Sequence, residues 1–132
     1  MTLVVDASMV VAGLVDSGLG GTWAESFLAS EPLAAPHLMP VEVASVLRRG
    51  AIVGDISGDT AALAHGDLLA LRVELFPYEP FAERVWELRA TITTYDAWYV
   101  AVAESLDAPL ATLDDKLRRA AGPRCQFAAP QT

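Results

Sequence analysis

Short apolar runs alternate along this chain with longer amphipathic stretches, and this alternation predicts strands interleaved with helices. The β-branched run Leu3–Val5 has the composition of a buried parallel strand. The order favours an α/β fold with three layers, in which helices cover both faces of a mostly parallel sheet of four to five strands. We predict further strands at 33–35, 74–76, 109–113 and 126–128, and helices at 9–15, 22–29, 38–53, 57–71, 80–90, 93–106 and 115–120.

Glycine, proline and threonine mark the predicted boundaries of these elements. The glycine-rich segment 18–21 is expected to end the first helix, and Gly54 to end the third. Thr93 is a good N-cap for the helix that follows it. With 132 residues, the chain is predicted to be a single domain over 1–129 with a loose tail at 130–132.

The composition is apolar and acidic. Hydrophobic residues make up 53% of the chain and the mean hydropathy is +0.35, which suggests apolar surface buried in an oligomer or against a partner. We predict no membrane span, because no stretch is long enough without charges. The N-terminus lacks the basic region of a signal peptide, and the single cysteine, Cys125, excludes an intramolecular disulfide and is expected to be a buried, inert thiol. A cytoplasmic protein is the expectation.

The net charge of −8 argues against nonspecific adhesion to nucleic acid, which depends on Lys and Arg. No Lys or Arg precedes Arg48. An acidic site neutralised by bound divalent cations can still accept a phosphodiester, and its field suits a basic protein partner. The simplest interpretation of the later basic residues is a solvated helix face; these are Arg48, Arg49, Lys116, Arg118 and Arg119.

Two acids stand at predicted strand ends. Asp6 follows the first strand, and Asp114, with Asp115 beside it, follows the fourth. Open α/β sheets bind ligands beyond the carboxyl ends of their strands, so these carboxylates would converge if the two strands are neighbours. Either acid alone would mean little.

Two further acids lie on predicted helices. Asp96 stands in an otherwise apolar and aromatic window, where a buried carboxylate is costly unless it is paired or holds a metal. Capping of its own helix, in a box with Thr93, explains Asp96 about equally well. For Glu42, a solvated first-turn glutamate that is paired with Arg49 or favoured by the helix dipole is by itself the better interpretation.

The four acids together suit Mg²⁺ or Mn²⁺, which prefer oxygen ligands. The sequence gives little support for a zinc site, a nucleotide-binding loop or a serine hydrolase. His37 and His65 fit no zinc spacing, and neither a Walker loop nor a Gly-x-Ser-x-Gly elbow is present.

The four acids stand in four longer segments of the chain. These are Val4-Val5-Asp6-Ala7-Ser8, Pro40-Val41-Glu42-Val43-Ala44-Ser45-Val46-Leu47, Tyr95-Asp96-Ala97-Trp98-Tyr99-Val100-Ala101-Val102-Ala103-Glu104 and Leu110-Ala111-Thr112-Leu113-Asp114-Asp115-Lys116-Leu117. In order and separation, they resemble the motifs of PIN-domain VapC toxins. The resemblance spans nearly the whole chain and implies a compact α/β/α PIN fold, a homodimer, and a cognate VapB-type antitoxin whose C-terminal segment would occupy the acidic groove.

The resemblance also implies an activity, the hydrolysis of RNA that leaves a 5′-phosphate. Asp6, Asp96 and Asp114 would bind one or two Mg²⁺ or Mn²⁺, and Glu42 would be an additional direct or water-mediated ligand. Supporting roles are expected at three positions: Ser8, which would orient a ligand or hold the turn; Thr112, as a structural hydrogen-bonding residue; and Asp115.

Two alternatives remain open. A catalytically silent protein of the same fold would serve only to bind the antitoxin. A phosphatase or receiver-like domain also places acids at strand ends, but Asp6-x-Ser8 departs from the Asp-x-Asp of haloacid-type phosphatases, and Lys116 lies on the wrong side of Asp114 for a receiver. Trp98 and Tyr99 are expected in the core or a dimer interface rather than stacked on bases.

Overall fold

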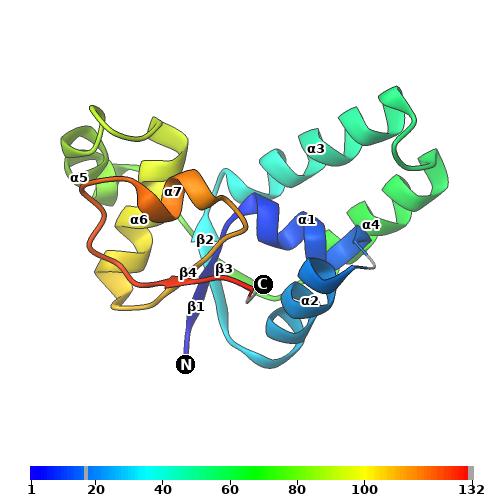
Figure 1. Ribbon diagram of the computed structural model, residues 1–132, viewed down its shortest axis with the longest axis horizontal. Helices are drawn as coiled ribbons and strands as arrows, with labels where there is room; N and C mark the ends of the chain where they lie inside the picture. Colours follow the sequence, from blue (N-terminus) through cyan, green and yellow to red (C-terminus); the bar gives the residue numbers. More distant parts are fainter. Residues whose placement is uncertain (17, 131–132) are drawn as a thin grey trace.

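A computed structural model describes residues 1–16 and 18–130 and shows a parallel sheet between two layers of helices (Figure 1). The strand order is β3-β2-β1-β4-β5, and each neighbouring pair is parallel, which confirms the predicted fold class. The strands are β1 (Leu3–Val5), β2 (Leu33–Pro36), β3 (Val73–Phe76), β4 (Leu110–Ala111) and β5 (Phe127–Ala128).

The helices divide between the two faces of the sheet. In Figure 1, α1 to α4 lie on one side of the strands, and α5, α6 and α7 lie on the other. The helices are α1 (Ala7–Val15), α2 (Leu19–Ser30), α3 (Met39–Val53), α4 (Gly58–Ala70), α5 (Ala82–Glu87), α6 (Thr94–Leu106) and α7 (Asp115–Arg119), with the 3-10 turn η1 (Glu79–Phe81) before α5.

Local chemistry sets several helix starts. Asp6, Ser57, Thr93 and Asp114 accept hydrogen bonds from backbone N–H groups in the first turns of α1, α4, α6 and α7. Helix α3 ends at Gly54, which has a φ of 85°, in the left-handed region that favours glycine. The prediction for this glycine is therefore confirmed.

Three predicted boundaries were wrong. Gly20 and Gly21 lie inside α2 instead of ending α1. Glycine at position 21 permits the close packing of α2 on the end of α1, because a Cβ there would lie 1.9 Å from the backbone oxygen of Asp16. The fourth strand ends at Ala111, because the next residues turn into the cap of α7. The helix expected at 80–90 is the 3-10 turn η1 followed by the short α5.

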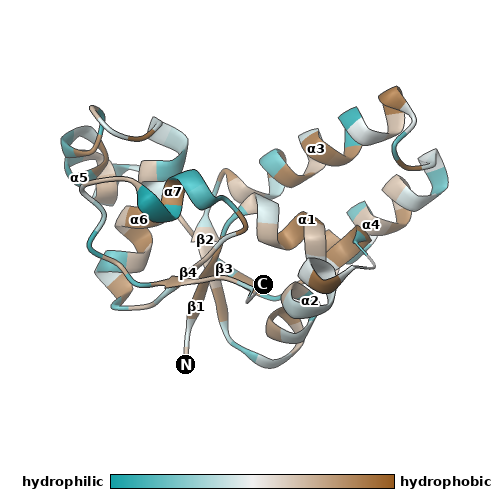
Figure 2. Ribbon diagram, in the orientation of Figure 1, coloured by the Kyte–Doolittle hydropathy of each residue, from teal (hydrophilic) through white to brown (hydrophobic). Residues whose placement is uncertain are grey.

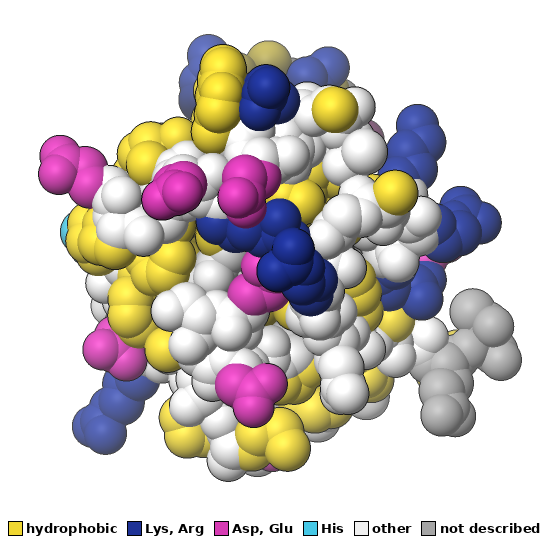
Figure 3. Space-filling view, turned by 90° about the vertical axis from the view of Figure 1, so that its left-hand side faces the viewer, with side chains coloured by type: hydrophobic (Ala, Val, Ile, Leu, Met, Phe, Trp, Pro, Cys, Tyr) yellow, Lys and Arg dark blue, Asp and Glu magenta, His cyan; other side chains and the backbone are white. Residues whose placement is uncertain are grey.

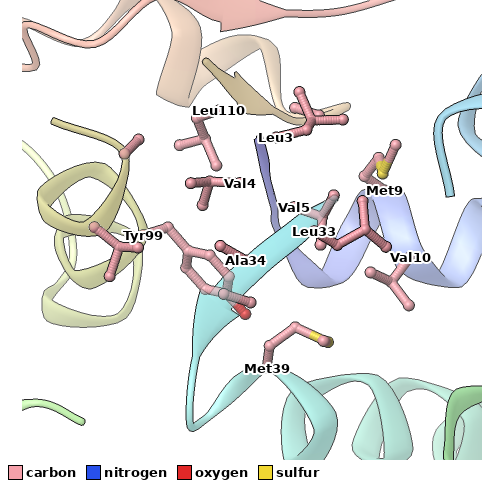
Figure 4. Packing of buried hydrophobic residues seen from close by; sticks show 14 of the residues in the cluster. Leu3, Val4, Val5, Met9, Val10, Leu33, Ala34, Met39, Tyr99 and Leu110 are labelled. Carbon is pink, nitrogen blue, oxygen red and sulfur yellow. The ribbon is translucent and has the colours of Figure 1, made fainter. Parts of the chain in front are cut away.

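The core lies on both faces of the central strands. All three residues of β1 are buried, and Val4 lies between Ala34 of β2 and Leu110 of β4 (Figure 4). Tyr99 of α6 covers the sheet on one side (Figure 4). The hydroxyl end of the Tyr99 ring points towards Met39 of α3. The buried tyrosine confirms the core prediction for this residue.

Helices α3 and α4 form a hairpin that extends away from the sheet, and apolar residues remain exposed on it (Figures 1 and 2). The surplus of hydrophobic residues is therefore partly surface. Among the described residues, no helix combines the length and the apolar composition required to span a membrane. The exposed apolar side chains of this hairpin are Val41, Val46, Ile52, Val53, Leu63 and Leu69.

Candidate active site at the carboxyl ends of β1 and β4

Asp6 lies at the centre of the candidate site, directly after β1. Its side chain is buried, and its Oδ1 accepts hydrogen bonds from Ser8 Oγ (2.7 Å) and from the backbone N–H of Met9 (3.0 Å). The Thr112 hydroxyl donates to the other carboxylate oxygen, Oδ2. These three donors hold the carboxylate in one orientation and offset part of the cost of burying it.

The turn after β4 is tied to the turn after β1. Val5 and Ala111 are paired in the sheet, and the Asp6 N–H donates to the Ala111 carbonyl at 3.2 Å. Ser8 Oγ, which donates to Asp6, accepts from the backbone N–H of Leu113 at 3.2 Å. Ser8 therefore holds the two turns together, which is one of the two roles predicted for it.

Thr112 and Asp114 continue this network. The Thr112 side-chain oxygen accepts from the Asp114 N–H at 3.0 Å, and Asp114 Oδ1 in turn caps α7 by accepting from the N–H groups of Lys116 and Leu117 at 2.9 and 3.2 Å. The hydrogen-bonding role predicted for Thr112 is thus present. Asp115 points elsewhere, since it is exposed and forms an ion pair with Arg118.

Glu42 and Asp96 approach from two helices on opposite faces of the sheet. Glu42 is in the first turn of α3 and accepts a hydrogen bond of 2.7 Å from Tyr99. Glu42 forms no ion pair with Arg49, so the predicted pairing was wrong, whereas its place in the first turn of α3 agrees with the predicted helix-dipole contribution. Asp96 is in the first turn of α6, where its N–H donates to Thr93 Oγ1 at 3.1 Å, so Thr93 is the N-cap of this helix, as predicted.

Burial and neighbouring carboxylates raise the pKa values of two of the four acids, Asp96 and Asp6. Burial raises the pKa of Asp96, and the nearby charges of Asp114, Asp6 and Glu42 raise it further. The pKa of Asp6 is raised first by burial and, to a smaller extent, by Asp114, against the lowering effect of its hydrogen-bond donors. Neighbouring carboxylates thus raise the pKa of Asp96 and of Asp6, and such an accumulation of negative charge favours a bound cation.

The donor set suits a hard divalent cation. The site offers only carboxylate and hydroxyl oxygens, the ligands that Mg²⁺ and Mn²⁺ prefer. Across 1–16 and 18–130, the hydrogen bonds to Asp114 and Glu42 use Oδ1 and Oε1, which leaves Oδ2 and Oε2 for a ligand. No three acidic, His or Cys side chains in these ranges are close enough to hold a metal as they stand. A metal ion held here would therefore need waters and substrate oxygens to complete its coordination.

A surface cleft opens beside two of the acids. Asp96 and Asp114 line a cleft of about 500 Å³, together with Arg89, Lys116 and the loop that joins α5 to α6. Two larger hollows lie elsewhere, and none of the four acids lines either of them. We assign the site by its chemistry, because cleft size alone says nothing about the carboxylates.

Charges of both signs mix on the side of the molecule that carries α5 (Figure 3). Part of the mixture is structural: Arg84 forms ion pairs with Glu104 at 2.7 Å and with Glu87 at 3.4 Å. The acidic chain therefore has no large basic surface on this side. Any cation near the four acids is then important for attracting an anionic ligand.

Sequence reasoning missed two residues near this site. Tyr99 was placed correctly in the core, but its bond to Glu42 was not predicted, although it stands three residues after Asp96 on the same helix. Arg89 was not singled out, because only the three-dimensional fold places the loop after α5 beside α7.

Comparison with known proteins agrees with this geometry. The family model of the PIN domain matches residues 3–123. Ribonuclease VapC1 of Mycobacterium tuberculosis is 39% identical over 125 residues, which are 94% of each chain. Two solved structures share the fold: PAE2754 from Pyrobaculum aerophilum (TM-score 0.70, 23% identity, 98% of this chain and 83% of that one) and VapBC2 from Rickettsia felis bound to a promoter DNA fragment (TM-score 0.69, 14% identity, 99% and 100%).

Proposed function

This chain belongs to the PIN-domain family and, within it, to the VapC ribonucleases, and on that premise we propose that it is a metal-dependent endoribonuclease toxin. The observation that supports the proposal most is that Thr112 links Asp6 to Asp114 beyond the ends of β1 and β4, while Asp96 lines the same cleft as Asp114. We propose that Glu42, in the first turn of α3, completes this set of acids. This edge of the sheet is also where the strand order changes direction, between β1 and β4, the usual place for a ligand in an open α/β sheet.

Three of these acids are proposed as metal ligands and the fourth as a direct or water-mediated ligand. Asp6, Asp96 and Asp114 would hold one or two Mg²⁺ or Mn²⁺, and Glu42 would complete the set. When bound, the cation lowers the pKa of a water molecule and neutralises charge on the phosphoryl oxygens. The attacking water adds to phosphorus and the bond to the 3′ oxygen breaks, so the products carry a 5′-phosphate and a 3′-hydroxyl.

The chain's other residues keep these acids in place. Ser8 and Thr112 donate hydrogen bonds to Asp6 and fix the direction of its free lone pairs. The cap of α7 fixes Asp114, so that Oδ2 can face a ligand. Tyr99 does the same for Glu42 from the core. Orientation of ligands before substrate arrives is the main contribution a protein makes to metal-assisted hydrolysis.

Partners follow from the same proposal. We propose neutralisation by a VapB-type antitoxin, homodimer formation, and a cytoplasmic place of action. The solved VapBC2 assembly supports the antitoxin by analogy of fold, and the exposed apolar side chains of the α3–α4 hairpin provide surface for a protein partner. The single cysteine suits a reducing compartment.

The decisive experiment measures RNA cleavage by the partner-free protein. Labelled structured RNAs are incubated with Mn²⁺ or Mg²⁺ and, separately, with EDTA, and the 5′ ends of the products are analysed. Asp6→Asn and Asp96→Asn are compared with Asp59→Asn, which changes an exposed aspartate in the first turn of α4. We expect discrete, metal-dependent cuts by the wild type and Asp59→Asn, and a loss of at least about 100-fold in the other two variants.

Other outcomes separate the alternatives. Equal cutting by all four proteins would indicate a contaminating ribonuclease and contradict the proposal. Absence of cutting across a broad RNA panel, with Mn²⁺ still raising the melting temperature of the wild type but not of Asp6→Asn, would favour the catalytically silent binding protein. Release of phosphate from a phosphomonoester would instead favour the phosphatase.

A further inference from the structure

Two cationic side chains share the cleft with two of the proposed metal ligands. Arg89 and Lys116 line it together with Asp96 and Asp114. We propose that these two cations form a phosphate-binding subsite for the RNA backbone, next to the phosphodiester that is cut. This inference rests on the proposed function, since it names the contacts by which the same site would hold a polyanion.

Arg89 is held in position by its own neighbours. Its guanidinium lies over the Trp86 ring, 4.8 Å from the ring centre, and its Nη1 donates to the Trp86 carbonyl at 2.7 Å. A guanidinium carries five N–H donors in a planar fork, so this arrangement leaves most of them for a phosphate. Stacking on the indole also reduces the conformational entropy that binding would cost.

Lys116 is tied to the catalytic edge through the backbone. Its N–H donates to Asp114 Oδ1 at 2.9 Å, so its side chain starts two residues from a proposed metal ligand. The side chain itself is exposed and lines the cleft. A phosphate that enters this cleft beside Asp114 would therefore lie in the space that the Lys116 side chain lines.

Neither cation is used by the fold as an ion-pair partner. Over 1–16 and 18–130, the ion pairs involve the N-terminus, Arg84 and Arg118, while Arg89 and Lys116 pair with no carboxylate. This holds although Asp96 and Asp114 line the same cleft. Their charges remain available to an external anion.

The charge of the whole chain makes these two positions important. With nine Lys and Arg against seventeen Asp and Glu, the protein has no general attraction for RNA. A phosphate chain that reaches the acids must be compensated locally, and among the described residues Arg89 and Lys116 are the cations that line this cleft. Lys116 is exposed, as the sequence interpretation expects, and the proposal gives it and Arg89 a further role.

The test measures how RNA binding depends on salt. The probe is a fluorescein-labelled single-stranded RNA of mixed sequence, because phosphate contacts do not depend on sequence. All measurements use the full chain carrying Asp6→Asn, which prevents cleavage. Arg89→Gln, Lys116→Gln and the double variant are compared with two controls that remove exposed cations outside the cleft, Arg119→Gln and Arg72→Gln.

We expect each cleft variant to reduce the slope of log Kd against log salt by about 0.7, and the double variant by about 1.4. The controls should keep the slope within about 0.3, and Arg89→Lys, which retains the charge, should recover most of it. Thermal unfolding checks that the folds are intact. An unchanged slope in the double variant would overturn the subsite.

Two further outcomes keep this inference distinct from the proposed function. If the double variant binds RNA normally but loses affinity for a poly-glutamate peptide, the cations serve an acidic protein partner and the RNA subsite is overturned. If the slopes fall as expected while the wild type cuts no RNA, the subsite stands and the nuclease proposal fails. If the wild type cuts RNA while the salt slopes of the variants are unchanged, the nuclease proposal stands and the subsite is overturned.

Discussion

The hydroxyl of Tyr99 donates a hydrogen bond of 2.7 Å to Oε1 of Glu42, across 57 positions of the sequence. The tyrosine ring is buried to 2% exposure in the core, whereas Glu42 lies at the site. The bond therefore joins α6 to α3 and makes the packing of the core determine the direction of a carboxylate. Burial and then the Glu42 carboxylate raise the pKa of Tyr99, so the phenol keeps its proton and acts as a donor.

We predict that Tyr99→Phe impairs cleavage more than it impairs folding. The ring still fills its place, but Glu42 loses the donor that orients it, so kcat should fall about tenfold while the free energy of unfolding falls by about 1 kcal/mol. Steady-state cleavage and urea denaturation measure the two quantities. Tyr95→Phe, an exposed tyrosine on the same helix, is the control. An unchanged kcat in Tyr99→Phe would show that the bond does not serve the reaction.

Removal of the Thr112 hydroxyl should affect both Asp6 and Asp114. Thr112→Val keeps the side-chain shape but deletes the donor to Asp6 and the acceptor for the Asp114 N–H. We expect a loss of about 1–3 kcal/mol in unfolding free energy, because a buried carboxylate oxygen loses its partner, and a loss of cleavage activity. Urea denaturation and the RNA assay check this expectation.

Thr112→Ser is the matched variant for this prediction. Serine retains the hydroxyl and loses only a methyl group, so it should keep most of the activity and stability. If Thr112→Ser were as damaging as Thr112→Val, the methyl packing rather than the hydrogen bonds would be responsible.

A separate ionic contact should make stability depend on pH. Burial of Glu104 works to raise its pKa, but hydrogen bonds from Arg84 and from the Arg124 N–H outweigh it and hold the pKa below its usual 4.5. The stabilisation is therefore present at neutral pH and is lost as the pH falls through the lowered pKa. Glu104→Gln should lower the unfolding free energy by about 1.5–3 kcal/mol at pH 7.

The difference between wild type and Glu104→Gln should shrink progressively in acid, which urea denaturation at a series of pH values will measure. Glu83→Gln changes an exposed glutamate on α5 and should show no such dependence. A Glu104→Gln effect that persisted unchanged in strong acid would exclude the ion pair as its cause.

Cys125 should be unreactive in the folded protein. Burial raises the pKa of its thiol to about 11, from an ordinary value of 9.0, so little thiolate exists near neutral pH. Alkylation by iodoacetamide at pH 8 should be about 100-fold slower than in urea, where burial is lost. Mass spectrometry follows the reaction. Equal rates in both conditions would contradict the protected environment.

The fold could be predicted from the sequence because the spacing of hydrophobic residues and the composition of each segment are local properties. The run Leu3–Val5 and the N-cap Thr93 act within a few residues, and both were predicted correctly. The position of Gly21 inside a helix could not be predicted, because the role of this glycine depends on contact with another helix. The strand ends indicated Asp6 and Asp114, but the bond from Tyr99 and the approach of Arg89 arise from packing between distant segments.

Asp6 depends on a donor that lies 106 residues further along the chain. β1 is flanked by β2 and β4, and the Thr112 hydroxyl and the Asp114 cap come from the turn after β4. During translation, a nascent chain therefore has no assembled carboxylate site until residue 117, which closes the cap, has been released for folding. A ribosome that makes this protein is thus exposed to its proposed activity only after nearly the entire domain has been synthesised.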